Sequence, residues 1–572
     1  MTPKPTSRNG ADAAPAGPVG RITGTSVGEL RFRIGPDEPL HLGEILLADS
    51  GSGAPPFPAR AASGPAGPLA SGSLNGPSPQ PTARGQEGPF YLRVVDLEYG
   101  ADARDGDWEE RTAGALMSSG GENLVLYDRE QRLFKSAVAE PLGYLQADGR
   151  FRKPKTLPPH FCPIRRPVAG DFRFLAPKKG DLELGFLRSG DEPLPDRLGL
   201  DPKALAQHIG IFATTGMGKS NLLKVLAGST MDSGQVGFLL LDPHGEYADG
   251  GAAVHPDGRP LRGLLHHPRS DRLHVYTSRP IPGFPGRVHE LAVSAAEITP
   301  ADFANVYNIS DAQEEALWAV GNLFRRDWIS RIDALEPEQL DAALGKGRFH
   351  PGTLNVLKRR CEQVLKQPVI HTDAAVSTTK AILSHLEAGH TVLVDTSGLF
   401  PSEELLVSAV LARSLLERYR DAARDPVWFR SLPPVCVTLE EAQRVLNQKG
   451  GSSNIFAQIA REGRKFKVGL GAVTQQPRLL SDELLSQLNT LVILGLADPT
   501  DRDRVRAGAR QDLSQVTKEI QMLEPGEALV TTPGAPFALP LKAHLYEDRI
   551  LEQQAAQPAA LRIAPKADAG FY

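Results

Sequence analysis

Short runs in which apolar and polar residues alternate fill the N-terminal part of the chain. They occur at 20–35 (GRITGTSVGELRFRIG), 40–48 (LHLGEILLA), 90–100 (FYLRVVDLEYG), 122–128 (ENLVLYD) and 132–145 (RLFKSAVAEPLGYL). A two-residue period interrupted by glycines predicts short β-strands joined by turns. The alternation therefore predicts a small β-barrel domain over residues 19–165.

Two segments in this part of the chain contain too few large apolar residues to form a core. Residues 1–18 are rich in Pro, Ala and Gly, and residues 51–89 contain nine prolines and eight glycines. Such a composition cannot bury enough apolar surface to compensate for the entropy lost on ordering. We therefore predict a disordered N-terminal tail over 1–18 and a disordered insertion in the barrel over 51–89.

From residue 166 the pattern changes to continuous apolar runs separated by longer segments. These runs are HIGIFA (208–213), VGFLLLD (236–242), TVLVDTS (391–397), PVCVTLE (434–440), VGLGAVT (468–474) and TLVILGLA (490–497). Continuous apolar strands are typical of a parallel sheet that helices cover on both faces. The pattern predicts an α/β core over 166–550, followed by a C-terminal tail over 551–572.

The long segment between the second and third runs, about 299–388, has a helical pattern instead. Thr299 followed by Asp302, and Ser310 followed by Gln313, have the spacing of capping boxes at helix starts. We predict an all-helical subdomain inserted into the sheet.

The composition restricts the class of protein. The chain has 572 residues, with 64 basic and 68 acidic side chains and a formal net charge of −4, so no global positive charge points to nucleic acid. Its three cysteines (Cys162, Cys361 and Cys436) are too scattered for a disulfide framework. The sequence has no signal-peptide pattern and no run of 18 apolar residues, so we expect a cytoplasmic protein without a membrane span.

The strongest chemical signal is HIGIFATTGMGKSNLLKVLAG, in which a strand, a glycine turn and a helix follow one another. This order predicts a P-loop, although Ala213 replaces the usual first glycine. Gly216 and Gly218 would let backbone N–H groups approach phosphates, Lys219 would reach the β- and γ-phosphates, and Ser220 would bind Mg²⁺. The predicted nucleotide-binding residues are Thr215, Gly216, Met217, Gly218, Lys219, Ser220 and Asn221.

A pair of acids follows the apolar strand at 434–439. Glu440 stands where a P-loop enzyme places its magnesium-side carboxylate, and Glu441 would polarise the attacking water. The alternative is that both acids only begin a solvated helix.

Two further strands end in polar residues. Gln475 has an amide that can sense the γ-phosphate or position water, or it simply ends a strand. Asp242, His244 and Glu246 follow the second core strand, and we interpret them as a loop near the nucleotide rather than a zinc site.

The segment IAREGRKFK carries the candidate arginine fingers, Arg464 first and Arg461 second. An arginine beside an ATP site can neutralise transition-state charge, often on a neighbouring subunit. The alternative is a solvated basic helix end, which is favourable for the helix dipole.

Taken in order, IFATTGMGKSN, LLLDPHGEY, LEEAQR and IAREGRKFKVGLGAVTQQP closely resemble the HerA ATPases of the HerA/FtsK division, in their bacterial type. The resemblance implies a RecA-like P-loop core behind a HAS-barrel-like domain, assembled as a homohexamer that hydrolyses ATP with Mg²⁺ and moves along double-stranded DNA. It also implies a NurA-type nuclease as partner in DNA end resection and repair. By resemblance, Lys219, Glu441 and Gln475 are catalytic and Arg464 acts on a neighbour's ATP. Gln476 departs from the family, which often has arginine there.

Other functions remain open. One is a motor or scaffold in an anti-phage defence complex with a different effector chain; another is a FtsK-like or conjugation-type DNA pump, which would need membrane helices or a DNA-reading domain. A small-molecule kinase would need an acceptor pocket.

Two expectations concern partners. The loop 447–454 (NQKGGSSN), with Lys449, is a candidate DNA contact. We find no second group of histidines or carboxylates with metal-binding spacing, so any nuclease activity is expected to come from another chain, docked on the β-barrel.

Overall fold

The computed structural model describes residues 18–49, 88–100, 107–119, 133–178, 180–250, 258, 260–307, 309–446 and 454–556. The chain divides into two compact units. The first contains the residues up to Ala176 and the short segment Arg188–Leu194; the second contains Pro177–Leu187 and the chain from Pro195 onward. Most of the predicted tail 1–18, most of the predicted insertion 51–89 and the predicted strand 122–128 lie outside the described residues.

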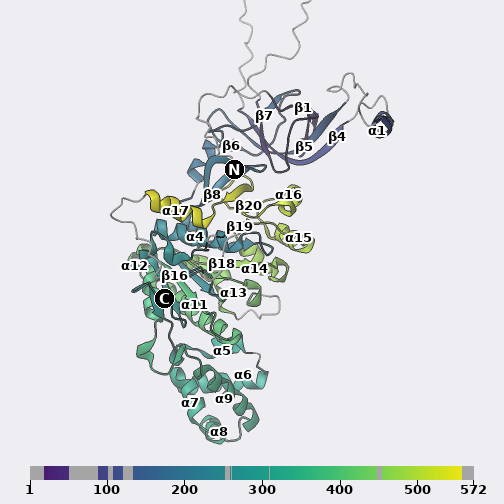
Figure 1. Cartoon of the computed structure of the whole chain (residues 1–572). Helices are drawn as coiled ribbons and strands as arrows, with labels where there is room; N and C mark the ends of the chain where they lie inside the picture. Colours follow the sequence, from purple (N-terminus) through teal and green to yellow (C-terminus); the bar gives the residue numbers. More distant parts are fainter. Residues whose placement is uncertain are drawn as a thin grey trace, which may run out of the picture. The chain divides into compact units, whose positions relative to one another are not determined.

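The first unit is built on an antiparallel sheet. Its strands are β1 (Gly20–Thr25), β2 (Leu30–Ile34), β3 (Ile45–Ala48), β4 (Phe90–Gly100), β5 (Phe134–Leu145), β6 (Phe151–Arg152) and β7 (Pro163–Arg165) (Figure 1). They are ordered β2-β1-β7-β3-β4-β5-β6, and a further pairing of β2 with β5 closes six of them into a barrel. The predicted β-barrel is confirmed.

Alternation along these strands fills the barrel interior. Phe32, Leu92 and Ile164 are fully buried in one hydrophobic cluster. One element differs from the prediction, because the helix α1 (Trp108–Ser119) lies between β4 and β5. Its alanine- and glutamate-containing sequence has no apolar face strong enough to be recognised among the neighbouring strands.

The second unit is built on a sheet of twelve strands. In spatial order they are β13 (Val288–Glu290), β12 (Leu273–Thr277), β16 (Thr391–Asp395), β11 (Gly237–Asp242), β17 (Val435–Leu439), β18 (Val468–Thr474), β10 (Ile209–Phe212), β19 (Thr490–Ile493), β20 (Glu527–Thr531), β21 (Leu539–Ala543), β8 (Leu182–Ser189) and β9 (Glu192–Leu200). The strands from β13 to β19 are parallel, and the order of β11, β17, β18 and β10 places the ends of four predicted strands side by side. This is the predicted α/β core of a P-loop ATPase.

The sequence pattern missed both ends of this sheet. At one end β12 and β13 extend the parallel part, but their short runs are interrupted by histidines. At the other end β20 and β21 are antiparallel, and β21 pairs with β8 from before the P-loop. The pairing of β21 with β8 joins residues more than 300 positions apart, so no local period reveals it.

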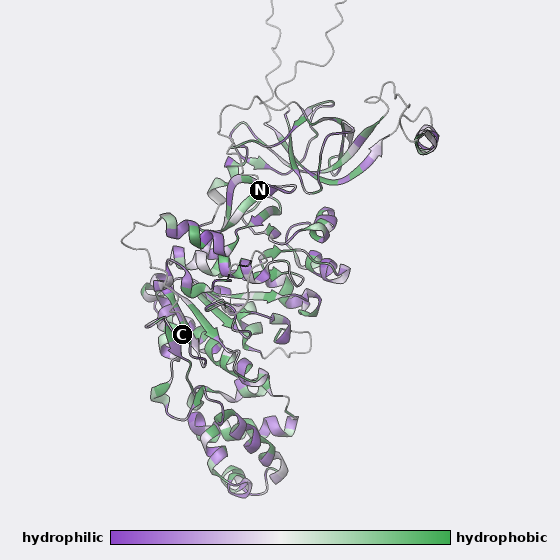
Figure 2. Ribbon diagram, viewed as in Figure 1, coloured by the Kyte–Doolittle hydropathy of each residue, from purple (hydrophilic) through white to green (hydrophobic). Residues whose placement is uncertain are grey.

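Helices cover both faces of the central strands. Leu239 and Leu241 of β11 face a core that contains α11 (Pro401–Ala422) and α13 (Ile455–Glu462). The opposite face is covered by α4 (Lys219–Ser233), which contacts β11 and β16. Figure 2 shows the central strands as the most continuously hydrophobic part of this unit. The remaining helices of this unit, the insertion apart, are α3 (Pro202–Leu205), α12 (Pro426–Ser431), α14 (Asp482–Gln487), α15 (Pro499–Gly508), α16 (Thr517–Met522) and α17 (Tyr546–Ala556).

The helical insertion is present and begins where its caps predict. Thr299 and Ser310 accept the N–H groups of Asp302 and Gln313, whose side chains return hydrogen bonds to the cap residues. The helices are α5 (Pro300–Val306), α6 (Asp311–Phe324), α7 (Trp328–Ala334), α8 (Pro337–Gly345), α9 (Pro351–Leu365) and α10 (Thr379–Glu387).

The C-terminal region differs from the expected tail, because α17 continues through residue 551 to Ala556. Arg549 and Gln553 on this helix donate hydrogen bonds to Asp232 near the end of α4, which explains why the helix extends beyond the expected boundary. None of the described helices has the length and apolar composition needed to cross a membrane.

Candidate nucleotide site

The P-loop connects the end of β10 to the start of α4. Gly218 is the N-cap residue of α4, so Lys219 is its first residue and the free N–H groups of the first turn point away from the helix. Gly216 and Gly218 have φ angles of 84° and 92°, which side chains other than glycine rarely adopt. A Cβ at Gly216 would meet no other atom within 4 Å, so its glycine is required by the backbone and not by crowding. The result is a concave run of backbone donors at a helix N-terminus, a favourable anion site.

Lys219 lies between the two predicted acids. Its Nζ is 2.9 Å from Glu440 Oε1 and 3.1 Å from Glu441 Oε1. These side chains are nearly withdrawn from solvent, with exposed fractions of 11% for Lys219, 1% for Glu440 and 13% for Glu441. β17 ends directly before Glu440, and only β18 separates it from β10, whose end leads into the P-loop. Residues more than 220 positions apart in sequence therefore meet here.

The environment of the two carboxylates differs. Burial raises the pKa of Glu440 above its ordinary value, although the charge of Lys219 opposes the change. Burial would also raise the pKa of Glu441, but the hydrogen bond from Gln443 and the charge of Lys219 outweigh it and lower the pKa. For Lys219 itself, burial opposes the charged form, but Glu440 and Glu441 prevail and raise the pKa. The pKa of Glu441 is therefore the lower of the two, and Glu441 is also the glutamate that retains more access to solvent.

Gln475 joins this cluster from the end of β18. Its Nε2 donates to Glu441 Oε1 at 3.1 Å, and its Oε1 accepts the hydroxyl of Thr215 in the P-loop. Gln443 donates to the other oxygen of Glu441 and accepts the Thr474 hydroxyl at 2.6 Å. Amide groups thus hold the Glu441 carboxylate from both sides. The backbone of Glu441 itself has a φ angle of 52°.

Ser220 is the residue predicted to bind the metal ion. Its hydroxyl donates to Glu246 Oε1 at 2.7 Å, and Glu246 comes from the loop after β11. Next to it, the buried Tyr247 donates to Glu440 Oε1 at 2.9 Å, while Glu440 Oε2 accepts no hydrogen bond from the described residues. A hard divalent cation prefers hydroxyl and carboxylate oxygens. The donor set of Ser220, Glu440 and Glu246 therefore fits Mg²⁺, and one of its oxygens is without another partner among the described residues.

The loop after β11 is organised by Asp242. Its carboxylate accepts the backbone N–H groups of His244, Gly245 and Tyr247. Burial raises the pKa of Asp242 to about 7, against the effect of these donors. The prediction that this loop lies near the nucleotide rather than at a zinc site agrees with this geometry, and Asp242 shapes the loop instead of pointing into the site.

Asn221, also predicted to bind nucleotide, has its polar atoms occupied elsewhere. Its side chain donates to the carbonyl of His544 at 2.8 Å and accepts the N–H of Tyr546 at 2.9 Å. This pair of bonds fixes the start of α17 against the first turn of the P-loop helix. Only the backbone N–H of Asn221 is left to serve a phosphate.

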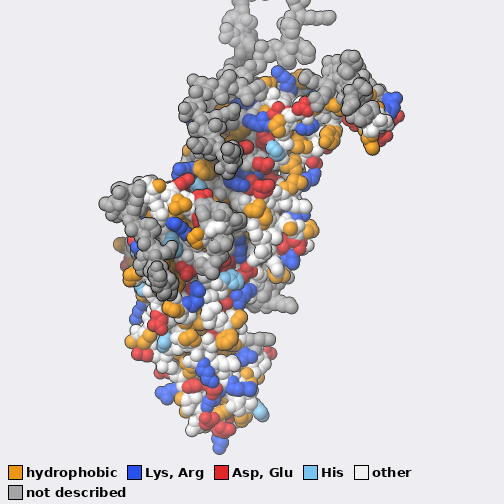
Figure 3. All heavy atoms as spheres, in the orientation of Figure 1, with side chains coloured by type: hydrophobic (Ala, Val, Ile, Leu, Met, Phe, Trp, Pro, Cys, Tyr) orange, Lys and Arg blue, Asp and Glu red, His pale blue; other side chains and the backbone are white. Residues whose placement is uncertain are grey.

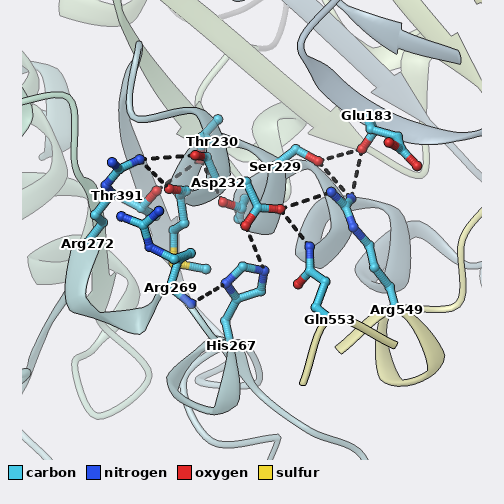
Figure 4. A network of polar contacts seen from close by, with 12 residues as sticks. Glu183, Ser229, Thr230, Asp232, His267, Arg269, Arg272, Thr391, Arg549 and Gln553 are labelled. Atoms are coloured by element: carbon cyan, nitrogen blue, oxygen red, sulfur yellow. Dashed lines mark hydrogen bonds and ion pairs between the residues drawn. The ribbon is translucent and has the colours of Figure 1, made fainter. Parts of the chain in front are cut away.

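The remainder of α17 is fixed to the far end of α4. Arg549 donates to the Ser229 hydroxyl, the Glu183 carbonyl and Asp232, as Figure 4 shows. Nearer the P-loop, the buried Lys224 is paired with Glu547 at 3.3 Å. The C-terminal helix is therefore part of the support of the P-loop, which no sequence motif indicates.

Arg464 and Arg461 do not reach this site within their own chain. They belong to the segment that precedes β18, whereas Gln475 follows its end. A seven-residue strand spans about 23 Å at 3.3 Å per residue, so the two arginines lie near the opposite edge of the sheet. There Arg464 lowers the pKa of the buried His208, although burial is the larger cause, and Arg461 is 3.6 Å from Glu483.

Sequence reasoning identified Lys219, Glu440, Glu441 and Gln475, and the structure brings them together. It missed Tyr247 and Gln443 as partners of the two glutamates. Gln443 lies in the LEEAQR motif and Tyr247 ends the LLLDPHGEY motif, so both were visible in the sequence, but neither spacing shows which glutamate each side chain contacts.

A glycine-rich loop between a strand and a helix, a lysine held by two acids that follow β17, and a glutamine at the end of β18, which lies between β17 and β10, define a P-loop ATP hydrolase. Residues 182–415 match the family described as helicase HerA, central domain. The matched segment lies within the ATPase core and contains the P-loop.

Two archaeal relatives agree with this result. The probable DNA double-strand break repair helicase HerA of Methanocaldococcus jannaschii is 26% identical over 410 residues, covering 63% of this chain and 75% of that protein. The DNA double-strand break repair helicase HerA of Saccharolobus solfataricus is 23% identical over 407 residues, covering 71% of this chain and 76% of that protein.

The solved structure of plasmid coupling protein TrwB with a non-hydrolysable ATP analogue is 15% identical, with a TM-score of 0.42 over 61% of this chain and 87% of that one. The bacterial type of HerA protein stays a prediction.

Proposed function

We propose that this chain is the motor subunit of a homohexameric ring that hydrolyses ATP with Mg²⁺ and translocates along double-stranded DNA. The observation that carries the proposal is the cluster of Lys219, Glu441 and Gln475, whose P-loop lysine lies within the segment 182–415 that matches the central domain of helicase HerA. The relatives named as double-strand break repair helicases support a role at DNA ends. A NurA-type nuclease is the proposed partner in end resection.

The catalytic roles follow from the geometry. Bound ATP would draw Lys219 from the two glutamates to its β- and γ-phosphates, since these carry more negative charge than the carboxylates share. The Mg²⁺ that accompanies ATP would neutralise phosphate charge, held by Ser220 and Glu440. Glu441, freed from Lys219, would orient and deprotonate water, because its pKa is lowered and its two oxygens are fixed by amides. Gln475 would connect Glu441 to Thr215 and so transmit the state of the γ-phosphate.

The position of Arg464 supports a shared site. Because it lies near the sheet edge opposite its own P-loop, it can complete an ATP site only on a neighbouring subunit. Ring assembly and the trans role of Arg464, with Arg461 second, are therefore one proposal. The homohexamer follows from the family resemblance, and native mass measures it directly.

The DNA contact is proposed to be electrostatic. On the face drawn in Figure 3, basic and acidic side chains are interspersed over the helical insertion, so this face offers no continuous basic strip. The proposed contact loop 447–454 lies almost wholly outside the described residues; its last residue, Asn454, caps α13. Binding should weaken steeply as salt rises, because phosphate contacts release counterions.

The deciding experiment measures ATP hydrolysis by the full chain alone, with long linear duplex DNA and with single-stranded DNA of equal length. We expect stimulation by the duplex, a native mass of six chains, and no hydrolysis by Lys219→Ala. A rate of hydrolysis that does not change with DNA of any length would reject the translocase.

Pulldown of the nuclease by the full chain and by a chain beginning at Pro167 tests the barrel as its docking site. Equal recovery of the nuclease by both chains would place the docking site on the ATPase core.

A further inference from the structure

Four histidines from distant parts of the chain meet at one end of the large sheet. His274 is in β12, His289 in β13, His385 in the last turn of α10, and His390 directly precedes β16. The rings of His274 and His385 are nearly parallel, with centroids 3.4 Å apart, and those of His289 and His390 lie 5.7 and 5.3 Å from His274. This group corrects the sequence-based expectation that no histidine cluster stands outside the P-loop site.

Three of these side chains have the spacing of metal ligands. One ring nitrogen from each of His274, His289 and His385 lies within 4.8 Å of the other two. Tetrahedral zinc with Zn–N distances of about 2.1 Å needs nitrogens about 3.4 Å apart. Binding therefore requires the side chains to rotate as well as to move closer, because an imidazole lone pair lies in the plane of its ring and parallel rings do not direct their lone pairs at one point.

Two of the ring nitrogens lack any other use. His274 Nδ1 and His289 Nε2 are buried, and neither has a hydrogen-bond partner among the described residues. A buried polar atom without a partner is unfavourable, and such atoms call for an explanation by a missing water or ion. A cation at the centre of the cluster would give both nitrogens a partner.

The protonation state suits a metal ion. Burial, together with the neighbouring imidazoles, lowers the pKa of His274 to about 3. The pKa of His289, of His385 and of His390 is also lowered, in each case chiefly by burial. All four rings are therefore neutral near pH 7, so their lone pairs are free to bind a metal without first losing a proton.

His390 has a supporting position. Its Nδ1 is 3.0 Å from His274 Nε2, so the two rings share one hydrogen bond and the orientation of His274 is fixed. Ligating histidines are commonly held in this way through their second nitrogen. A pocket lined by His289 and the loop that follows β12 borders the cluster and offers a path of entry.

We propose that His274, His289 and His385 bind one Zn²⁺ ion per chain, with His390 as the positioning residue. An all-imidazole donor set favours zinc or a neighbouring late transition metal over Mg²⁺ or Ca²⁺, which prefer oxygen. The ion joins the edge strand β13 to β12 and to α10. Since β13 is only three residues long and pairs on one side alone, a metal bridge would hold it in the sheet.

The site is separate from the nucleotide site. His274 is near the beginning of β12 and His390 precedes β16, whereas the P-loop cluster gathers at the ends of the parallel strands. The proposal therefore stands or fails independently of the proposed function.

The test is metal binding by the full chain after removal of metals with a chelator. With Mg²⁺ in excess to occupy carboxylate sites, we expect one Zn²⁺ per chain on equilibrium dialysis. With Co²⁺ we expect the intense visible absorption of a four-coordinate site that has three imidazole nitrogens and one water as ligands. The double variant His289→Gln/His385→Gln should lose both signals. His390→Gln should keep the stoichiometry but weaken the affinity about 10- to 100-fold, as loss of a supporting partner does. His160→Gln, at an exposed histidine of the barrel, is the matched control and should behave as the unaltered chain.

Several results would overturn the proposal. These are no zinc retained by the unaltered chain, zinc retained equally by the double variant, or a cobalt spectrum of the weak six-coordinate type. Because the first and third measurements use the unaltered chain, misfolding of a variant cannot produce them. Zinc should also raise the melting temperature of the unaltered chain in proportion to the logarithm of its concentration, and leave that of the double variant unchanged.

Discussion

Replacing Lys219 by Met should destabilise the nucleotide-free ATPase unit in a way that depends strongly on pH. The methionine keeps the apolar stem and removes the ammonium that lies 2.9 Å from Glu440. Glu440 then remains as a carboxylate with a side chain only 1% exposed and with one oxygen that has no partner among the described residues.

The size of the effect has an upper limit set by proton uptake. Breaking a buried ion pair from one side costs about 3–5 kcal/mol. Glu440 can avoid part of this cost by binding a proton, and doing so from an ordinary pKa of 4.5 costs about 1.4 kcal/mol for each pH unit above that value. The penalty is therefore limited to about 5 kcal/mol at pH 8 and about 2 kcal/mol at pH 6.

The sign follows from the raised pKa of Glu440. The folded chain binds a proton that the unfolded chain has already lost, so stability falls as pH rises between the ordinary and the raised pKa. Removing Lys219 takes away the charge that opposes this rise, and the window extends to higher pH. Urea unfolding followed by the fluorescence of Trp328, which is fully buried in this unit, measures the change.

The matched control is the double variant Lys219→Met/Glu440→Gln. A neutral amide needs no counter-charge, so most of the lost stability should return and its dependence on pH should vanish. If Lys219→Met were equally destabilised at pH 6 and pH 8, or if the double variant were no more stable than the single one, the pair would not be the buried contact described here.

Three further predictions concern hydrolysis and its support. Glu441→Gln should bind ATP as the unaltered chain does but hydrolyse it about 10²- to 10⁴-fold more slowly, because the general base is lost and the phosphate cradle is not; near-normal phosphate release would exclude Glu441 from that role. Mixing Arg464→Ala chains with Lys219→Ala chains should restore part of the hydrolysis that each lacks alone, since some interfaces then contain both intact residues, whereas Arg464→Ala mixed with itself should not. Arg549→Met should lower the free energy of unfolding by about 1–3 kcal/mol, because Asp232 and the Ser229 hydroxyl lose a charged partner; Arg424→Met, at an exposed arginine, serves as the control and should change it little.

Local sequence patterns were enough to predict many of the secondary-structure elements and the P-loop. Period-two alternation predicted β1, β2, β4 and β5 of the barrel, because a strand with one buried face needs every second residue apolar. The capping boxes at Thr299 and Ser310 predicted two helix starts, since those bonds form within four residues. The P-loop was equally visible, because its glycines, lysine and serine act from one continuous segment.

Only the tertiary structure decided how the separate motifs combine. The order of strands β11, β17, β18 and β10 brings Glu440, Glu441 and Gln475 to Lys219, and it also places Arg464 out of reach of that lysine. The antiparallel extension, the fixing of α17 on α4 and the meeting of His274, His289 and His385 likewise join segments far apart in sequence. Periodicity and spacing report on interactions within one element, whereas these contacts depend on which elements pack side by side, and that is set by the free energy of the whole sheet and its two covering layers.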